Sequence, residues 1–187
     1  LPKVLHKVLG RPLLAHALDK LSFIENQYVV VGHESDMVIN SLPSSTKHIM
    51  QKDQLGTGHA VATVVSDDLF VDNKSEFTVV VPGDVPAIDA KDIELLISEV
   101  ETKSSPVGFL TAIVNNPYGY GRVIRNNEET RIVEEKDCID GEREINEINS
   151  GIYCFKTDFL IENIDSLDTK NAQGEFYLTD LIGIANN

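Results

Sequence analysis

Apolar residues alternate between two spacings along the first half of the chain. Positions three and four residues apart predict amphipathic helices, and short β-branched runs predict strands. The predicted helices cover 13–21, 35–42, 57–65 and 90–100, and the predicted strands cover 27–31, 48–51 and 77–84. The run Phe77–Val81 lacks polar alternation, which is typical of a strand buried on both faces of a parallel sheet. This order predicts an α/β fold with a right-handed, doubly wound, mostly parallel Rossmann-like sheet.

The second half of the chain is richer in strands. Runs of alternating and β-branched residues predict strands over 106–114, 121–125, 131–135 and 148–155. A turn over 126–129, a polar loop over 139–146 and a closing helix over 175–185 complete the expected order.

The sequence Gly-Asp-Val-Pro at 83–86 closes the most apolar strand. Open α/β sheets bind ligands at the carboxyl ends of their strands, and a carboxylate there is suited to hold a divalent metal against phosphates. Asp84 has an alternative role as a cap for the helix expected near Asp89. The segment alone leaves these two roles about equally supported.

A second segment, residues 51–60, leads from a polar loop into a helix. Gly56, Thr57 and Gly58 would present bare amides to an anion or to the edge of a base, aided by the helix dipole. Gly-Thr before a helix is also a common N-cap, so this segment alone is weak evidence. His33, after a predicted strand, and His59, within the helix, lack partners at metal-ligand spacing and receive no role.

Composition narrows the classes of partner. The 187 residues carry a formal charge of −14, which argues against binding to nucleic acid or to an anionic membrane surface. An anionic small ligand would need local lysines, arginines or a metal ion. No apolar stretch is long enough for a membrane span, no secretion signal is evident, and the two cysteines lack zinc spacing. The cytoplasm is therefore the expected location.

Seven segments, taken in order, resemble the uridylyltransferase domain of the bacterial N-acetylglucosamine-1-phosphate uridylyltransferases, a family of sugar-nucleotide pyrophosphorylases. The segments are Leu-Pro-Lys-Val-Leu (1–5), Gln-Leu-Gly-Thr-Gly-His-Ala (54–60), Gly-Asp-Val-Pro (83–86), Tyr-Gly-Tyr-Gly-Arg (118–122), Val-Glu-Glu-Lys-Asp (133–137), Glu-Ile-Asn-Ser-Gly-Ile (147–152) and Asn-Ala-Gln-Gly-Glu-Phe-Tyr-Leu-Thr-Asp (171–180). The resemblance runs from residue 1 to about residue 185. Seven segments in register are far more specific than any one of them.

The resemblance implies a reaction that joins UTP to N-acetylglucosamine 1-phosphate, releasing pyrophosphate and UDP-N-acetylglucosamine with help from Mg²⁺. The product feeds cell-wall peptidoglycan and lipopolysaccharide synthesis. Lys3 matches the family's phosphate-binding lysine, Asp84 its metal ligand, and these two are the expected catalytic residues. Gln51, Gly56 and Thr57 match positions that hold the uracil, whose edge needs both a donor and an acceptor. Without the resemblance, Lys3 would be a solvated charge at a helix start.

On the sugar side, Gly121, Glu134 and Asn149 match the family's contacts to N-acetylglucosamine. Glu175, Tyr177 and Thr179 align with further sugar-site positions, although ordinary helix-start chemistry explains those three residues nearly as well. Glu134 would otherwise be an exposed strand carboxylate. Arg122 and Lys136 would either hold phosphate or pair with neighbouring acids such as Glu135.

Several family parts have no counterpart in residues 1–187. The family opens with a strand and a Gly-x-Gly-Thr-Arg loop that cradles the triphosphate, and this strand would lie between the strands at 27–31 and 77–81. Its absence would leave two open strand edges and a cleft, so we expect residues ahead of Leu1 in the natural protein. The family's second metal ligand, an Asn in Gly-Val-Asn, and its acetyltransferase β-helix domain are also missing.

We therefore expect residues 1–187 to form a nucleotidyltransferase domain that is inactive or weakly active alone. A homotrimer is expected only in a longer form that carries the β-helix. One alternative is a related pyrophosphorylase that uses another sugar or nucleotide. A second alternative, from a different class, is a non-catalytic module that binds nucleotide sugars.

Overall fold

The computed structural model describes residues 1–32, 34–126 and 129–186 of the chain. His33, at the end of a predicted strand, and Asn127 and Glu128, in the predicted turn, lie outside the described residues. The elements of the first half are η1 (Lys3–Leu5), β1 (Lys7–Val8), β2 (Arg11–Pro12), α1 (Leu13–Lys20), β3 (Tyr28–Val31), α2 (Ser35–Ile39), β4 (Lys47–Met50), α3 (Thr57–Val65), α4 (Asp68–Val71), β5 (Phe77–Val80) and α5 (Ala90–Thr102). Those of the second half are β6 (Val107–Ile113), β7 (Arg122–Arg125), β8 (Thr130–Val133), α6 (Asp140–Arg143), β9 (Glu147–Lys156), α7 (Thr157–Asn163), η2 (Ile164–Ser166) and α8 (Asp180–Ile184).

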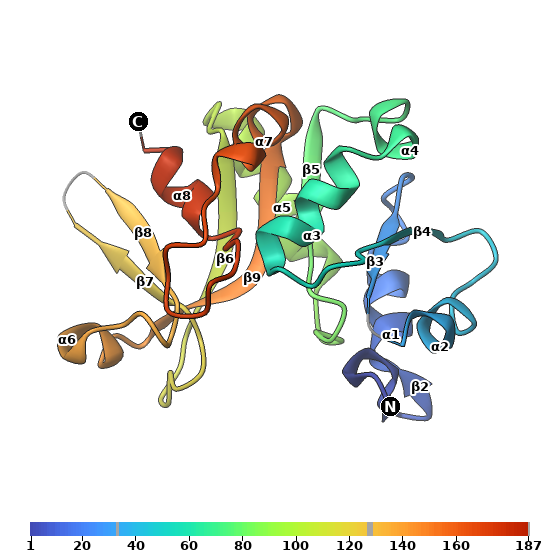
Figure 1. Cartoon of the computed structure of the whole chain (residues 1–187), viewed down its shortest axis with the longest axis horizontal. Coiled ribbons are helices and arrows are strands. Elements are labelled where there is room, and N and C mark those ends of the chain that lie inside the picture. Colours follow the sequence, from blue (N-terminus) through green and yellow to red (C-terminus); the bar gives the residue numbers. More distant parts are fainter. Residues whose placement is uncertain (33, 127–128, 187) are drawn as a thin grey trace.

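The strands form two principal sheets that do not pair with each other (Figure 1). In the smaller sheet, β3 and β4 are parallel, with Tyr28 opposite Lys47 and Val31 opposite Met50. In the larger sheet, the ten-residue β9 is central and pairs antiparallel with β5, β6 and β7, while β8 pairs with β7. The α/β class is confirmed, and the parallel arrangement is confirmed for β3 and β4.

The expectation of a mostly parallel sheet needs a correction at β9. Every described pair in the five-stranded sheet is antiparallel, and β9 lies between β5 and β6 and runs opposite to both. It follows that β5 and β6 share one direction although they never pair. The spacing of apolar residues could not reveal this insertion, since a buried antiparallel strand has the same apolar pattern as a buried parallel one.

Side chains alternate along β9 between two cores, as strand geometry requires. Ile152 and Cys154 pack with Ile93, Leu96 and Val100 of α5. Tyr153 and Phe155 face the other way, into a cluster built from α3, α7 and α8. Cys154 is fully buried and packs as a small core residue. Helices therefore cover both faces of the larger sheet, as a doubly wound fold requires.

Strands β3 and β5 run in the same direction. Near their starts, the Asn26 side chain donates to the Asn73 carbonyl, four residues before β5. At their carboxyl ends, Val31 belongs to the apolar cluster that contains Leu14, and the space beside Gly83 is closed by Leu14 and Val4. Both carboxyl ends thus lie beside the same N-terminal segment.

A cavity of about 950 Å³ separates these two strands. Its lining includes the whole of β3 and β5, and Figure 1 shows the two sheets standing apart at this place. The cleft expected between residues 27–31 and 77–81 is therefore present. Each strand has a paired neighbour on one side only, β4 for β3 and β9 for β5, so their facing edges are open within the described structure.

Two predicted segments differ from the structure. Residues 139–146, expected to be a loop, contain the short helix α6, whose first turn is closed by a hydrogen bond from the Ile139 N–H to the Glu142 carboxylate. The closing helix, expected over 175–185, covers only Asp180–Ile184. Residues 175–179 are not helical because the backbone of Phe176 is engaged elsewhere: its N–H donates to Leu55 and its carbonyl accepts from Gly58. None of the described helices is both long and apolar enough to cross a bilayer.

An added strand should stabilise the domain. Pro2, Lys3 and Val4 line the cavity at the carboxyl ends of β3 and β5, so a five-residue β-branched segment fused ahead of Leu1 would enter between the two edges and run parallel to both. We expect the melting temperature to rise by roughly 5 °C or more and amide exchange in β3 and β5 to slow. A control fusion with proline at alternate positions has no N–H donors toward one of the two edges. Equal melting temperatures for the two fusions would contradict the open-edge description.

Candidate active site

The phosphate end of the candidate site lies at the carboxyl end of β5. The Lys3 ammonium is 2.6 Å from the Asp84 carboxylate. The Lys3 side chain is 79% exposed and that of Asp84 is 26% exposed, so the acid is the better anchored partner. The hydrogen bond and charge of Asp84 raise the pKa of Lys3. Two residues that lie 81 positions apart in the sequence are thus adjacent, next to a cavity that Gly83 also lines.

Asp84 has few potential co-ligands for a metal. In the described parts of the chain, no group of three or more His, Cys, Asp or Glu side chains is arranged to hold a metal ion. Mg²⁺ in phosphate-transfer sites commonly takes one or two carboxylates and fills its other positions with water and phosphate oxygens. One half-buried carboxylate at a phosphate site therefore fits such an ion as a single ligand.

The loop between β4 and α3 places the candidate base-binding residues together. The Gln51 side-chain Nε2 lies 3.2 Å from the Gly56 carbonyl oxygen and 3.0 Å from His59 Nδ1. Gly56 has a φ of 110°, and a Cβ there would lie 2.6 Å from the Phe176 carbonyl oxygen. Glycine is therefore required at position 56 both by the backbone angle and by the close approach of residues 175–176.

The first turn of α3 is tied to the segment before α8. The Thr57 hydroxyl accepts from the Leu178 N–H at 3.1 Å, and the Gly58 N–H donates to the Phe176 carbonyl at 2.8 Å. The N–H of Gly56 donates to no described residue. Thr57 thus has a structural partner in addition to any ligand, and an amide donor at Gly56 remains available.

The candidate sugar-side residues meet around Glu134. Its Oε1 accepts from the Thr179 hydroxyl at 3.2 Å, and its Oε2 lies 3.3 Å from the position that a Cβ on Gly121 would occupy. Burial raises the pKa of Glu134, and the charges of Asp137, Asp180 and Glu175 act in the same direction. A partly buried carboxylate among other acids is well placed to accept hydrogen bonds from neutral sugar hydroxyls and poorly placed to receive an anion.

Asn149 is fixed from three sides. Its N–H donates to the Gly121 carbonyl at 2.9 Å, its Nδ2 contacts the Tyr153 hydroxyl at 2.5 Å, and its Oδ1 accepts from the Gly151 N–H. Tyr153 is buried, and burial raises its pKa. No sequence motif marks Tyr153 as a site residue, since a tyrosine in a buried strand is usually only a core residue.

Glu175 and Tyr177 do not line the cavity that Glu134, Asn149 and Thr179 border. The Tyr177 ring is buried and its hydroxyl donates to Asp137 at 3.0 Å. Burial and that carboxylate raise the pKa of Tyr177 to about 12. Glu175 instead packs beside Gly56. Glu175 and Tyr177 both belong to the segment that packs against the base-binding loop.

One cavity connects the two ends of the site. The same space of about 950 Å³ that separates β3 from β5 is also lined by residues from the phosphate end, the base-binding loop and the sugar side. They are Lys3, Gly83, Thr57, Glu134, Asn149 and Thr179. Five of the eleven residues expected from the sequence, together with the neighbour of Asp84, therefore border one cavity at the carboxyl ends of the strands, where α/β sheets bind ligands.

Sequence comparison matches residues 2–127 to the MobA-like NTP transferase domain. The chain belongs to this family. It is also 46% identical over 184 residues to the bifunctional protein GlmU of Fervidobacterium nodosum, covering 98% of the chain and 40% of that protein. The bifunctional protein GlmU of Lactococcus lactis subsp. lactis is 45% identical over 188 residues, with the same coverage. The chain thus spans about 40% of the length of these curated relatives.

Solved structures agree on the fold. A UDP-glucose pyrophosphorylase complexed with UDP-glucose has a TM-score of 0.71 at 14% identity, covering all of this chain and 79% of that one. HddC from Yersinia pseudotuberculosis has a TM-score of 0.62 at 19% identity, covering 96% and 74%. The domain is a nucleotidyltransferase with a Rossmann-like α/β fold, and its resemblance to the GlmU uridylyltransferase domain is confirmed.

In this nucleotidyltransferase domain, Arg122 is a structural residue that the sequence left undecided. Its side chain is 2% exposed and pairs with Glu135 at 2.7 Å, so pairing with a neighbouring acid is the correct alternative. The same guanidinium also donates to the Tyr120 carbonyl, and the Glu135 carboxylate accepts from the Gly119 N–H. The pair therefore anchors the loop that ends at Gly121.

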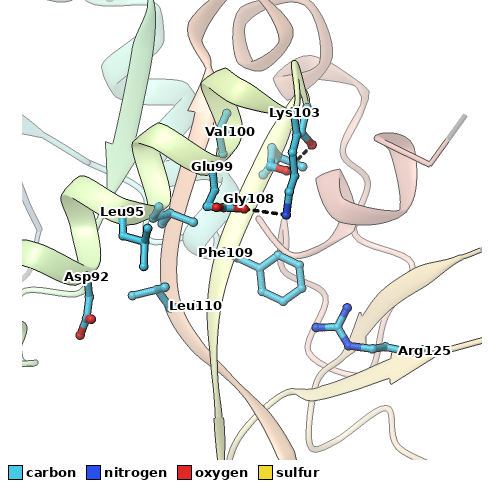
Figure 2. Close-up of a pocket in the computed structure, with 12 residues that line it drawn as sticks. Asp92, Leu95, Glu99, Val100, Lys103, Gly108, Phe109, Leu110 and Arg125 are labelled. Atoms are coloured by element: carbon cyan, nitrogen blue, oxygen red, sulfur yellow. Dashed lines mark hydrogen bonds and ion pairs between the residues drawn. The ribbon is translucent and has the colours of Figure 1, made fainter.

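A second, smaller cavity of about 390 Å³ lies between α5 and β6 and is lined by other residues than the expected site (Figure 2). Figure 2 shows Leu95, Phe109 and Leu110 beside the ion pair of Lys103 with Glu99. None of the eleven expected site residues lines it. The larger cavity is therefore the candidate active site of the domain.

Replacing Glu134 with glutamine should change stability in a pH-dependent way. The raised pKa of Glu134 means that its neutral form fits the fold best, so its stabilising contribution is fully present below the unfolded-state pKa and is lost as pH rises through the folded-state pKa. Glutamine keeps an acceptor for Thr179 and cannot ionise. We expect a higher melting temperature than wild type at neutral pH and no difference in acid, measured by thermal denaturation across pH.

Glu144→Gln is the matched control, because it removes one exposed carboxylate from the same region. It should leave the pH profile of the melting temperature parallel to that of wild type. A Glu134→Gln profile that also stays parallel would show that burial of Glu134 has no energetic consequence.

Proposed function

We propose that this domain transfers a uridylyl group from UTP to N-acetylglucosamine 1-phosphate, giving UDP-N-acetylglucosamine and pyrophosphate. The observation that carries the proposal is one cavity bordered by a phosphate end that contains the Lys3–Asp84 ion pair, a base-binding loop, and a sugar side suited to neutral hydroxyl groups. The family supports nucleotidyl transfer, and the similarity to bifunctional GlmU proteins supports a sugar phosphate as acceptor. The motif resemblance supplies uracil and N-acetylglucosamine as the particular groups.

In-line transfer between two phosphates asks the protein chiefly for positioning and charge neutralisation. Lys3 would bind a phosphate oxygen, exchanging its contact with Asp84 for one with the nucleotide. Gln51 and the free Gly56 amide would hold the uracil edge. On the other side, Glu134 and Asn149 would accept and donate hydrogen bonds to the hydroxyl and acetamido groups of the sugar, with Gly121 allowing the close approach of Glu134.

We propose Mg²⁺ as the metal, with Asp84 as its protein ligand. When bound, the ion would neutralise charge on the phosphates during in-line attack. The residues present fit this ion because the carboxylate lies beside a phosphate-binding lysine at the edge of the cavity. We propose the cytoplasm as the location of the reaction, because a charged nucleotide and a charged sugar phosphate are both needed in one aqueous compartment.

Release of pyrophosphate should require UTP, N-acetylglucosamine 1-phosphate and Mg²⁺ together. The assay uses a longer form that includes the family's opening segment, with residues 1–187 alone in parallel. We expect the longer form to turn over and the shorter form to show little or no activity. Full activity of residues 1–187 alone would contradict the need for further phosphate-binding groups.

Asp84→Ala should lower turnover by about 10²-fold or more, the size of effect seen when one charge-stabilising group is lost. Asp92→Ala, which removes an exposed carboxylate on α5, should leave turnover unchanged. Equal rates for the two variants would exclude a metal role for Asp84. Turnover with a different sugar phosphate or nucleotide would favour a related pyrophosphorylase, and binding of UDP-N-acetylglucosamine without turnover would favour a binding module.

A further inference from the structure

His59 contacts the base-binding loop but has no assigned role. It lies in the first turn of α3, partly buried, with Nδ1 3.0 Å from Gln51 Nε2. Its ring stacks on Phe176, with ring centroids 6.3 Å apart and planes 29° apart. Phe176 is itself fixed through backbone bonds to Leu55 and Gly58. The imidazole is therefore held in place from the opposite side of the loop.

The partners of Gln51 determine which end of its carboxamide remains free. The Gly56 carbonyl can only accept, so the group that faces it must be the NH₂ end of Gln51. His59 Nδ1 faces the same NH₂ end and must also accept, which places the imidazole proton on Nε2. Both N–H bonds of the carboxamide are then used, and no described residue donates to its Oε1.

A ligand at Gln51 therefore meets an acceptor and finds a donor nearby at the Gly56 amide. Uracil presents a ring N3–H between two carbonyl oxygens, and this pattern complements such a pair. Cytosine presents an N3 lone pair and an amino group at the same edge, so its N3 would face the Gln51 oxygen without a proton between them. The orientation of the Gln51 carboxamide thus distinguishes uracil from cytosine.

We infer that His59 is a positioning residue that holds the Gln51 carboxamide with its carbonyl oxygen outward, so that the site selects a base with an N–H at ring position 3. With the Gly56 carbonyl as the one anchor, a turn of the carboxamide about its terminal torsion would cost a single hydrogen bond. Two anchors on the same nitrogen hold one orientation. This inference rests on the proposed function, because it assumes that a nucleobase lies against Gln51.

The test measures dissociation constants for UTP, CTP and 3-methyluridine 5′-triphosphate by calorimetry, in wild type and in two variants of the form that includes the opening segment. His59→Leu removes the acceptor, whereas His59→Asn retains an oxygen acceptor near the position of Nδ1. We expect wild type to favour UTP over both other nucleotides by about tenfold or more, the effect of one hydrogen bond. His59→Leu should reduce this ratio to within about threefold, and His59→Asn should restore most of it.

A second measurement needs no nucleotide. Nitrogen-15 NMR of wild type in neutral solution should show the His59 proton on Nε2, and both Gln51 side-chain N–H signals should be shifted in His59→Leu. A proton on Nδ1, or a UTP to CTP ratio that is the same in wild type and His59→Leu, would overturn the inference while the proposed function stands. Failure of wild type to bind any of the three nucleotides would overturn the proposed function and this inference with it.

Discussion

The backbone bonds between Phe176 and the loop around Gly56 are the interaction on which the site depends. The Phe176 N–H donates to the Leu55 carbonyl, and the Phe176 carbonyl accepts from the Gly58 N–H. These bonds bring two segments that are far apart in the sequence as close together as two paired strands. The approach leaves no room for a side chain on Gly56. Because Phe176 is bonded to the base-binding loop and Thr179, three residues later, donates to Glu134, the backbone of this segment holds the two substrates' expected positions relative to each other.

The second constraint is the space between β3 and β5. Backbone N–H and C=O groups must find partners, and both strands present an edge to this cavity that no described strand occupies. The carboxyl ends of the strands are held together by the N-terminal segment, where Val4 and Leu14 close the space beside Gly83. The site residues gather at that closed end. The open strand edges therefore affect the stability of the whole sheet more than they affect the relative positions of the site residues.

Local patterns were sufficient to predict most elements. The β-branched run at β5, the helical stripes of α1, α3 and α5, and the carboxylate after β5 all follow from propensity and from the placement of ligands in α/β sheets. The antiparallel β9 and the non-helical Phe176 segment could not be predicted in this way. Both are decided by hydrogen bonds to strands or loops more than 25 residues away, which leave no local sequence signal.

The candidate site was predictable to a similar degree. Asp84, Glu134, Lys3 and Thr179 all stand in motifs, but the pairing of Lys3 with Asp84 and of Thr179 with Glu134 is seen only in the fold. The sequence did not mark His59 or Tyr153 as a site residue, because each has an ordinary structural explanation in its own helix or strand. Their contacts, to Gln51 and to Asn149, connect different elements and exist only in the folded chain.

Charge then explains why the two ends of the site differ. The chain carries a formal charge of −14, and Glu134 is surrounded by Asp137, Glu175 and Asp180, whose field favours its neutral form and repels anions. At the other end, Asp84 is balanced by Lys3, which leaves that region close to neutral. An anionic nucleotide that displaces Lys3 from Asp84 would expose a carboxylate beside its own phosphates, and this repulsion is relieved only if a cation enters with the nucleotide. If Asp84 holds the cation as proposed, the Lys3–Asp84 pair would link nucleotide binding to cation binding, because either charge alone would leave the other uncompensated.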